Sequence, residues 1–472
     1  MKILFASSEV FPFSKTGGLA DMAAFLPKTL SSLGHDVRVI TPYYQTIAEK
    51  LERIGTRPIR FGGIETIVHF YRLVENDVTH IFVQNMHYFE RDMLYGYHDD
   101  AERFSCFAFA VLEYLDVADF AADILHLNDW QTGMIPYLLD VHYRHKGDPY
   151  RFLPTVLTIH NLEYQGSFEP YVSRFFNTDF DYTYVHFGRV NFLKAGIERA
   201  TRINTVSPTY RSEALSHEYG FSLNGALKKR ESDFYGILNG IDYDVFDPRT
   251  DRLLKRNYGI KDVRSGKRTN KEGLLQELGL KVDPNVPLIA YIGRLAAQKG
   301  VNLMTQVLED IVYHSKAGFV LMGSGNDSYQ EFFRYLTRKY PDRVASYIGF
   351  NERMAHRIYA AADLFLMPSR FEPCGLGQMI AMRYGALPVV RETGGLRDTV
   401  IPYNVHTQEG TGFGFTRYDA HDFKEKVYDA IRIYESARSD FRNMVKRAMK
   451  QNFSLKRMAL EYERLYQTII GA

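Results

Sequence analysis

The segment LFLMPSRFEPCGLGQMIAMRYGALPVV, residues 364–390, decides the fold class. It opens on the apolar run Leu364–Met367 and closes on a second apolar run, Leu387–Val390, each of the length and composition of a buried strand. A longer helical pattern separates them. A strand, a helix and a second strand in this order form a βαβ unit, whose two strands are parallel.

The same alternation of short apolar runs and longer helical patterns extends along the whole chain. Further strand candidates in the first half are Lys2–Ala6, Val37–Thr41, His80–Val83, Ile124–Leu127, Val156–Ile159, Ile203–Val206 and Tyr235–Leu238. Those in the second half are Leu288–Ile292, Gly318–Met322 and Val344–Ile348. We therefore predict an α/β protein with two Rossmann-like, doubly wound domains.

A turn-rich passage separates the two halves. Asn239–Asp242 and the following Asp247–Arg249 are typical of a hinge between domains. We place the domains at residues 1–244 and 245–455, and expect a C-terminal helix at 456–472 to return to the first domain. The basic stretch 264–270 is interpreted as a solvated loop before a helix.

The composition excludes several classes of protein. At 472 residues the chain exceeds the size at which one core stops growing. Its 58 Lys and Arg against 56 Asp and Glu give a net charge of +2, so no bulk charge favours nucleic acid or an anionic membrane as a partner. Two cysteines, Cys106 and Cys374, are too few for a disulfide framework or a zinc site of their own.

The N-terminal apolar run is too short for a signal peptide, and no apolar stretch approaches the roughly 20 residues of a membrane helix. The expected location is the cytoplasm.

Two glycine loops occupy matching places in the two halves. Lys15–Asp21 reads KTGGLAD and Glu392–Asp398 reads ETGGLRD, each where a strand and loop give way to a helix. Paired glycines let backbone N–H groups approach a ligand closely, and the N-terminus of the following helix favours anions and hydroxyl groups. A simple tight turn is the structural alternative for either loop.

In the second half, side chains suited to a diphosphate follow two predicted strands. Arg294 and Lys299 come after Leu288–Ile292, and Glu372 comes after Leu364–Met367. Open α/β sheets bind ligands at the carboxyl ends of their strands, and two cations beside a helix start suit a diphosphate. A solvated basic face and a capping glutamate are the structural alternatives.

No P-loop, HExxH motif or carboxylate cluster with Mg²⁺ spacing is present, so we expect neither a metal nor a cofactor.

In the first half, two predicted strands end in polar residues. Asp129 and the only tryptophan, Trp130, follow one strand, and His160 and Asn161 follow the next. A single histidine at a strand end is more often structural than catalytic. Together, however, these groups predict a polar pocket with a hydrophobic wall, which is typical of sugar recognition.

These motifs resemble those of the bacterial glycogen synthase and plant starch synthase family over essentially the whole chain. The resemblance rests on KTGGLAD (15–21), HNLEYQG (160–166), FLKAG (192–196), TVSPTY (205–210), ILNGID (237–242), GRLAAQKG (293–300), PSRFEPCGL (368–376) and TGGLRDTV (393–400). It implies the GT-B fold, in which two Rossmann-like domains face each other across a deep cleft.

The resemblance also implies the reaction. Enzymes of this family move α-D-glucose from a nucleoside diphosphate to the non-reducing 4-OH of an α-1,4-glucan such as glycogen, with retention and without a metal. Bacterial relatives mostly use ADP-glucose, which we expect here, and UDP-glucose is the alternative donor.

On the first domain, the resemblance implies that Lys15 and Gly18 touch the diphosphate region and the acceptor side, with Asp21 nearby. It implies that His160 contacts the glucose 6-OH close to the anomeric carbon. Asp129 and Asn161 are implied to shape the same pocket.

On the second domain, the resemblance implies that Arg294 and Lys299 hold the diphosphate, while Glu372 binds glucose hydroxyls or stabilises positive charge. Phe350 matches the aromatic position that stacks on the nucleobase. The remaining implied substrate-binding residues are Asn239, Cys374, Gly375, Leu376, Thr393, Gly394 and Gly395.

The chain departs from the family pattern at three positions. Asn128 stands where a histidine is usual, and Gly377 stands where a threonine is usual. Ile380 replaces the second of two glutamates spaced by seven residues in the wider GT-B pattern, which normally reads a ribose.

Other function classes fit the sequence less well. Sugar transferases that act on lipids usually dock to membranes through a basic, apolar face, and this chain is nearly neutral. A glucan phosphorylase would need a pyridoxal phosphate lysine, and a non-catalytic glucan-binding scaffold would lose the cations and the glutamate. No GxGxxG follows the first predicted strand, which disfavours a dinucleotide oxidoreductase.

Overall fold

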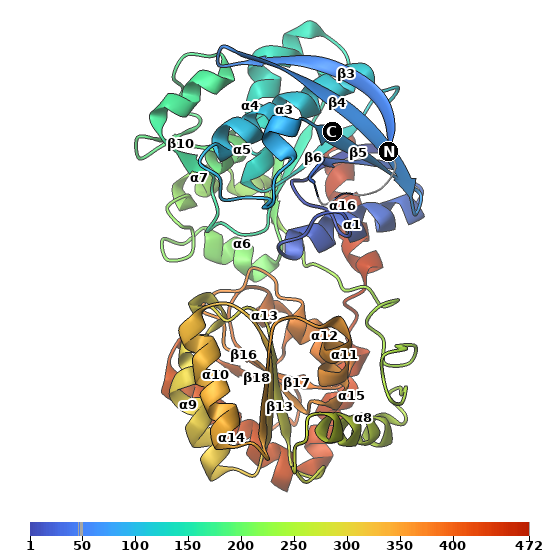
Figure 1. Ribbon diagram of the computed structural model, residues 1–472, viewed down its shortest axis with the longest axis vertical. Coiled ribbons are helices and arrows are strands. Elements are labelled where there is room, and N and C mark those ends of the chain that lie inside the picture. Colours follow the sequence, from blue (N-terminus) through green and yellow to red (C-terminus); the bar gives the residue numbers. More distant parts are fainter. Residues whose placement is uncertain (46, 48–50, 472) are drawn as a thin grey trace. The chain divides into compact units, whose positions relative to one another are not determined.

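The computed structural model describes residues 1–45, 47 and 51–471 and divides into two compact units (Figure 1). Unit 1 comprises Met1–Ile237 and the chain from Leu455 onward, and unit 2 comprises Leu238–Ser454. The division falls between Ile237 and Leu238, a few residues before the boundary expected after residue 244. Among the described residues, none of the helices is both long and apolar enough to cross a membrane.

Unit 1 is built on a nine-stranded sheet in the order β12-β11-β7-β6-β1-β2-β5-β4-β3. The strands are β1 (Lys2–Ala6), β2 (Asp36–Pro42), β3 (Glu52–Phe61), β4 (Ile64–Glu75), β5 (Val78–Gln84), β6 (Ile124–Asn128), β7 (Thr155–Ile159), β11 (Arg202–Thr205) and β12 (Phe234–Gly236). The seven strands from β12 to β5 are parallel, and all seven strands predicted in the first half are confirmed.

Two features of unit 1 depart from a purely parallel sheet. Strands β3 and β4 form an antiparallel hairpin that pairs with β5 and was not predicted. A small separate sheet contains β8 (Ser167–Phe168), β9 (Val185–His186) and β10 (Arg189–Asn191).

Helices cover both faces of the main sheet, as in a doubly wound fold (Figure 1). The apolar residues of α1 (Gly18–Ser32) and of α16 (Leu455–Ile470) share one core with β1 and β2. The residues of α3 (Asp100–Val117) and α5 (Phe192–Arg199) belong to the core on the other face. The sheet is thus buried on both sides, which accounts for the continuously apolar strands in the sequence.

A buried polar network fastens α16 to the sheet. His126 lies 2.6 Å from the hydroxyl of Tyr466 through Nδ1 and 2.7 Å from the hydroxyl of Thr158 through Nε2. Thr158 in turn donates to Asn204. Burial lowers the pKa of the fully buried His126 to about 3, so its ring is neutral at pH 7.

This histidine predicts a pH dependence of stability. Its pKa in the folded state lies below the ordinary value of about 6.5. The buried neutral ring therefore stabilises the fold fully above pH 6.5, and this stabilisation is lost as the pH falls towards 3. In the wild type, this histidine lowers the free energy of unfolding by up to about 1.4 kcal/mol for each pH unit in this window. We expect His126→Gln to abolish that decrease. Urea unfolding at pH 7.5, 6.5 and 5.5 measures the effect. The exposed His406→Gln is the matched control, and an unchanged pH dependence in His126→Gln would contradict this role.

Unit 2 contains a six-stranded parallel sheet in the order β15-β14-β13-β16-β17-β18. The strands are β13 (Leu288–Ile292), β14 (Gly318–Gly323), β15 (Val344–Ile348), β16 (Leu364–Met367), β17 (Leu387–Arg391) and β18 (Phe413–Phe415). The five strands predicted in this half are confirmed, whereas the short edge strand β18 was not predicted.

The helices of unit 2 alternate with its strands. They are α8 (Val263–Glu277), α9 (Val301–His314), α10 (Asp327–Lys339), α11 (Glu352–Ala361), α12 (Gly377–Arg383), α13 (Gly394–Thr399), α14 (Ala420–Ser436) and α15 (Arg438–Lys450).

The interpretation of residues 264–270 as a solvated loop is wrong, because they lie within α8. Gly266 packs so closely on Tyr258 that an added Cβ would lie 2.2 Å from the tyrosine Cβ. Lys267 is buried and donates to the carbonyls of Ala360 and Tyr384, at the ends of α11 and α12. One basic residue of this stretch, Lys267, therefore caps helices in the interior.

Strand order locates the ligand edge of each unit separately. In unit 2 the chain runs from β13 outward to β15 and returns to β16 beside β13, so the order reverses between β13 and β16. In unit 1 the reversal lies between β1 and β6. Open α/β sheets bind ligands at such switch points, outside the carboxyl ends of the strands.

Candidate functional site

Lys299 and Glu372 form a tight ion pair at the switch point of unit 2. Lys299 follows β13, and its Nζ lies 2.9 and 2.8 Å from the two carboxylate oxygens of Glu372, which follows β16. Glu372 is only 4% exposed, and Ser369 donates a third hydrogen bond to it over 3.0 Å. Two of the predicted residues thus meet here, whereas the supporting serine was not predicted.

A glycine explains why the loop after β13 lies so close to the loop after β16. Gly300, directly after Lys299, has φ +74°, and an added Cβ would lie 1.9 Å from the carbonyl oxygen of Pro368. Only glycine combines this backbone conformation with such close contact. The GRLAAQKG motif therefore packs against Pro368 through Gly300, and this contact holds Lys299 beside Glu372.

Arg294 is the second cation at this edge. Its side chain is exposed and donates to the Gln298 amide oxygen over 3.1 Å, while Tyr291 donates to its backbone carbonyl. In the described part of the chain, no carboxylate lies within ion-pair distance of Arg294. Its charge is therefore available to an anionic ligand.

The glycine loop of unit 2 is held by backbone packing. A Cβ on Gly394 would lie 1.9 Å from the carbonyl oxygen of Glu372, and one on Gly395 would lie 2.2 Å from that of Cys374. Gly395 N–H donates to the Glu372 carbonyl over 3.1 Å. These glycines, next to Thr393, thus have a structural reason that is independent of any ligand.

The other implied residues of unit 2 lie along the same loops or beside them. Gly375, at φ +75°, and Leu376 precede α12, and burial raises the pKa of the Cys374 thiol to about 12. Asn239 is buried, and its Oδ1 has no hydrogen-bond partner within the described ranges. Phe350 follows β15 with 75% of its surface exposed, so its ring is open to stacking.

The glycine loop of unit 1 has a different environment. Gly17 has no side chain to cap α1, and Glu9, which follows β1, holds the loop before the helix by accepting from the N–H and the hydroxyl of Thr16 at 2.5 and 2.9 Å. Burial raises the pKa of the Glu9 carboxyl. This role of Glu9 was not predicted from the sequence.

The exposed part of this loop carries a neutralised pair. Lys15 Nζ donates to both carboxylate oxygens of Asp21, at 2.6 and 2.8 Å. An added Cβ on Gly18 would meet no atom within 4 Å. In contrast to Gly394 and Gly395, Gly18 has no steric reason to be glycine.

His160 and Asp129 come together at the carboxyl ends of β7 and β6. The His160 N–H donates to Asp129 Oδ1 over 2.7 Å, and the His160 ring lies 2.9 Å from Asn128 Oδ1 through Nε2. Burial lowers the pKa of His160 to about 3. Burial also raises the pKa of the Asp129 carboxyl to about 7, although N–H groups of His160 and Asn161 bind it.

Asp129 combines a positive φ of +55° with a ψ of −172°, a backbone region occupied almost only by glycine. This conformation is strained for a residue other than glycine, and such strain is concentrated at functional sites. Its carboxylate clamps the backbone that carries His160. Asn161 closes a local turn by accepting from the N–H of Glu163.

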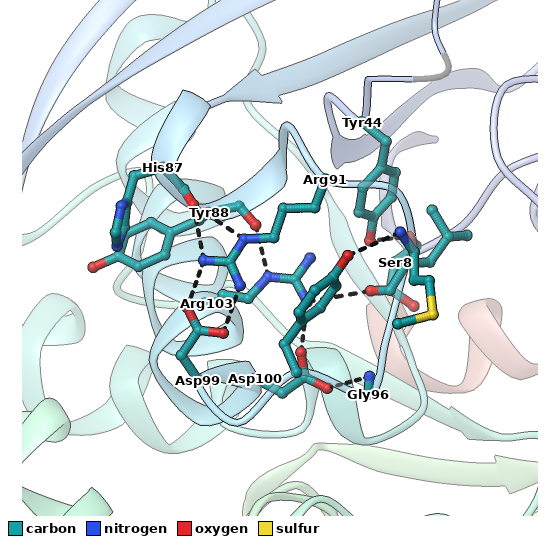
Figure 2. A network of polar contacts seen from close by, with 12 residues as sticks. Ser8, Tyr44, His87, Tyr88, Arg91, Gly96, Asp99, Asp100 and Arg103 are labelled. Carbon is teal, nitrogen blue, oxygen red and sulfur yellow. Dashed lines mark hydrogen bonds and ion pairs between the residues drawn. The ribbon is translucent and has the colours of Figure 1, made fainter.

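A further polar network, shown in Figure 2, shapes the loop next to Ser8, which follows β1. Arg103 has 0% exposure and donates to Asp100 and to the carbonyl of Tyr88, while Arg91 pairs with Asp99.

This network supports contacts at the end of β1. Asp100 accepts from the N–H of Gly96 over 2.8 Å, and the neighbouring Tyr95 hydroxyl lies 2.7 Å from the Ser8 hydroxyl. Tyr44 donates to the carbonyl of Ser8 over 2.8 Å. The sequence did not indicate this network, since its members are spread over residues 8 to 103.

Two family models match the chain. Residues 2–229 match the model described as the starch synthase catalytic domain, and residues 276–450 match the model described as glycosyl transferases group 1. The two matches fall on unit 1 and unit 2, respectively.

Known bacterial proteins resemble the chain over its full length. It is 60% identical over 475 residues to a glycogen synthase of Acholeplasma laidlawii, with 100% of this chain and 99% of the relative covered. It is 45% identical over 488 residues to a glycogen synthase of Exiguobacterium sibiricum, with 99% of each chain covered.

Solved structures resemble it as well. The catalytic domain of starch synthase IV from Arabidopsis thaliana, bound to ADP and acarbose, matches with a TM-score of 0.89 and 34% identity over 100% of this chain and 99% of that one. A sucrose-phosphate synthase from Thermosynechococcus elongatus matches with a TM-score of 0.64 and 18% identity over the same shares, which is a likeness of fold alone.

Proposed function

This chain belongs to the glycogen synthase and starch synthase family of GT-B glycosyltransferases, and from that premise we propose that it transfers α-D-glucose from ADP-glucose to the non-reducing 4-OH of an α-1,4-glucan, with retention and without a metal. The observation that carries the proposal is the Lys299–Glu372 pair beside the unopposed cation of Arg294 at the switch point of unit 2. The ADP in the related starch synthase structure supports ADP-glucose as the donor.

Unit 2 supplies the groups for the leaving diphosphate. Breaking the anomeric C–O bond builds negative charge on the diphosphate and positive charge on the sugar ring, and catalysis follows from stabilising both in the transition state. Arg294 and Lys299 are fixed cations for the first charge. Backbone N–H groups at Gly375 and Leu376 assist them.

Glu372 provides negative charge for the glucose ring, which becomes positively charged in the transition state. Its carboxylate is held by Lys299 and Ser369, so its position is set before the substrate binds. We assign it to the hydroxyl groups of the glucose and to the positive charge that develops on the ring. Phe350 stacks on the adenine.

Unit 1 supplies groups for the sugar and the acceptor. His160 binds a hydroxyl of the donor glucose, and Asp129 and Asn161 hold the loop that carries it. The substrates are also contacted by Lys15, Gly18 and Asp21.

A double displacement would need a carboxylate on the far face of the anomeric carbon. We favour front-face attack, in which the acceptor 4-OH forms the new bond as the old one breaks and its proton passes to the departing diphosphate.

One assay tests this function. ADP-glucose and UDP-glucose, each labelled in the glucose, are offered separately with glycogen in buffer containing EDTA. We expect faster incorporation from ADP-glucose and release of the label by an amylase specific for α-1,4 bonds. Preference for UDP-glucose would select the alternative donor. Loss of activity in EDTA that Mg²⁺ restores would contradict the metal-free mechanism, and label that resists the amylase would contradict the stated linkage.

A further inference from the structure

We propose that Asn128 is a positioning residue that holds His160 in one neutral tautomer, with the proton on Nε2, so that Nδ1 offers a lone pair to a hydroxyl group of the donor sugar. The proposal rests on the proposed function for the identity of the sugar. The tautomer itself depends only on contacts within unit 1.

The orientation of the Asn128 amide is set by the end of β1. Asn128 is 1% exposed, and its Nδ2 lies 3.0 Å from the carbonyl oxygen of Ala6. A carbonyl oxygen only accepts hydrogen bonds, so the amino group of the amide has to face Ala6. The reverse orientation would place two acceptor oxygens against each other in a buried place, which is costly. The amide oxygen of Asn128 therefore faces His160.

That oxygen determines which ring nitrogen carries the proton. His160 Nε2 lies 2.9 Å from Asn128 Oδ1, and because this oxygen can only accept, Nε2 must donate. A neutral imidazole has one N–H, so Nδ1 is left unprotonated. Burial supports the neutral form, since it lowers the pKa of His160 to about 3.

The lone pair on Nδ1 remains available. Within the described residues, His160 makes its polar contacts through Nε2 to Asn128 and through its backbone N–H to Asp129, and none through Nδ1. The residue as a whole is half-buried. With both the backbone and Nε2 held by consecutive residues at the end of β6, the ring presents Nδ1 in a fixed direction.

The tautomer of His160 determines the direction of its hydrogen bond with the sugar. A sugar hydroxyl that meets Nδ1 has to donate its proton, so the enzyme recognises that hydroxyl as a donor. A fluorine atom in its place cannot donate, and the bond would be lost. Such second contacts to a histidine set its tautomer and its function in many enzyme sites.

The first test uses ¹⁵N NMR of histidine-labelled full-length protein without substrates, and the His160 signals are identified by their absence in His160→Gln. We expect a protonated nitrogen at Nε2 and an unprotonated one at Nδ1. In Asn128→Leu both shifts should move towards the average of the two tautomers. A protonated Nδ1 in the wild type, or unchanged shifts in Asn128→Leu, overturns the proposal.

The second test is a double-mutant cycle on glucosyl transfer. We expect Asn128→Leu to lower kcat/KM by about tenfold, the usual effect of one lost hydrogen bond, and to have no further effect in a His160→Ala background. Additive effects of Asn128→Leu and His160→Ala overturn the proposal.

The two tests separate the two proposals. Failure of glucosyl transfer in the wild type leaves the NMR result standing, and failure of the NMR prediction leaves the transferase activity standing. The wild-type spectrum also keeps the proposal falsifiable if Asn128→Leu does not fold.

Discussion

Replacing Lys299 with alanine is expected to lower kcat/KM for glucosyl transfer by about 10²- to 10³-fold, the range seen when one preorganised donor to a developing anion is removed. Lys299 supplies a cation to the departing diphosphate, and it also binds both oxygens of the buried Glu372. Its removal therefore weakens two parts of the site together. Initial rates with ADP-glucose and glycogen measure the loss.

A stability effect has to be separated from the catalytic one. Lys299→Ala leaves a buried carboxylate that retains only the bond from Ser369, and an unpaired buried charge is destabilising. The double variant Lys299→Ala/Glu372→Gln removes that charge, so it should recover thermal stability without recovering activity. The exposed Lys281→Ala is a control for the loss of one lysine. Activity near the wild-type level in Lys299→Ala would refute the diphosphate assignment.

Gly18→Ala is expected to fold at least as stably as the wild type and to lose activity by about 10²-fold. Gly18 is the first residue of α1, its φ is not left-handed, and an added Cβ meets no atom within 4 Å. Alanine favours helices over glycine by up to about 1 kcal/mol, so the folded state should gain. The space above Gly18 is where we propose that the substrate approaches, and a displacement of about 1 Å can reduce the rate 10²-fold.

Two alanine variants calibrate this result. Gly225→Ala in α7 (Asn224–Lys229) also meets open space and should change neither fold nor activity. Gly395→Ala should fail to fold correctly, because its Cβ would collide with the Cys374 carbonyl. Thermal melts together with initial rates distinguish the three cases. Full activity in Gly18→Ala would remove the unit 1 glycine loop from the substrate site.

The parallel strands could be predicted from the sequence because they are buried on both faces. Strands such as Leu288–Ile292 are continuously apolar, and their predicted bounds match the structure. The hairpin of β3 and β4 could not be found in this way. Its residues are largely exposed or half-exposed, so no apolar run marks it.

Helix α8 was misread for a related reason. Its basic residues indicate solvent when they are read one by one, yet Lys267 is buried and satisfied by carbonyl groups from other helices. A lysine that caps distant helices cannot be recognised from its neighbours in sequence. The same limit applies to the buried Arg103, which donates to the carbonyl of Tyr88.

For the candidate site, the sequence indicated which residues bear the chemistry but not how they are held. Lys299 and Glu372 were assigned separate roles, and the structure pairs them directly. The orientation of Asn128 depends on a contact with Ala6, at the end of a neighbouring strand that lies far away in the chain. Such contacts follow from strand order, which a single sequence does not specify.

The most direct test of the account is a crystal structure of the protein with ADP bound. We predict that the diphosphate oxygens lie within hydrogen-bond distance of Lys299 Nζ and the Arg294 guanidinium, at the carboxyl end of β13, with the adenine against Phe350. A nucleotide bound elsewhere, with neither cation touching its phosphates, would contradict the account.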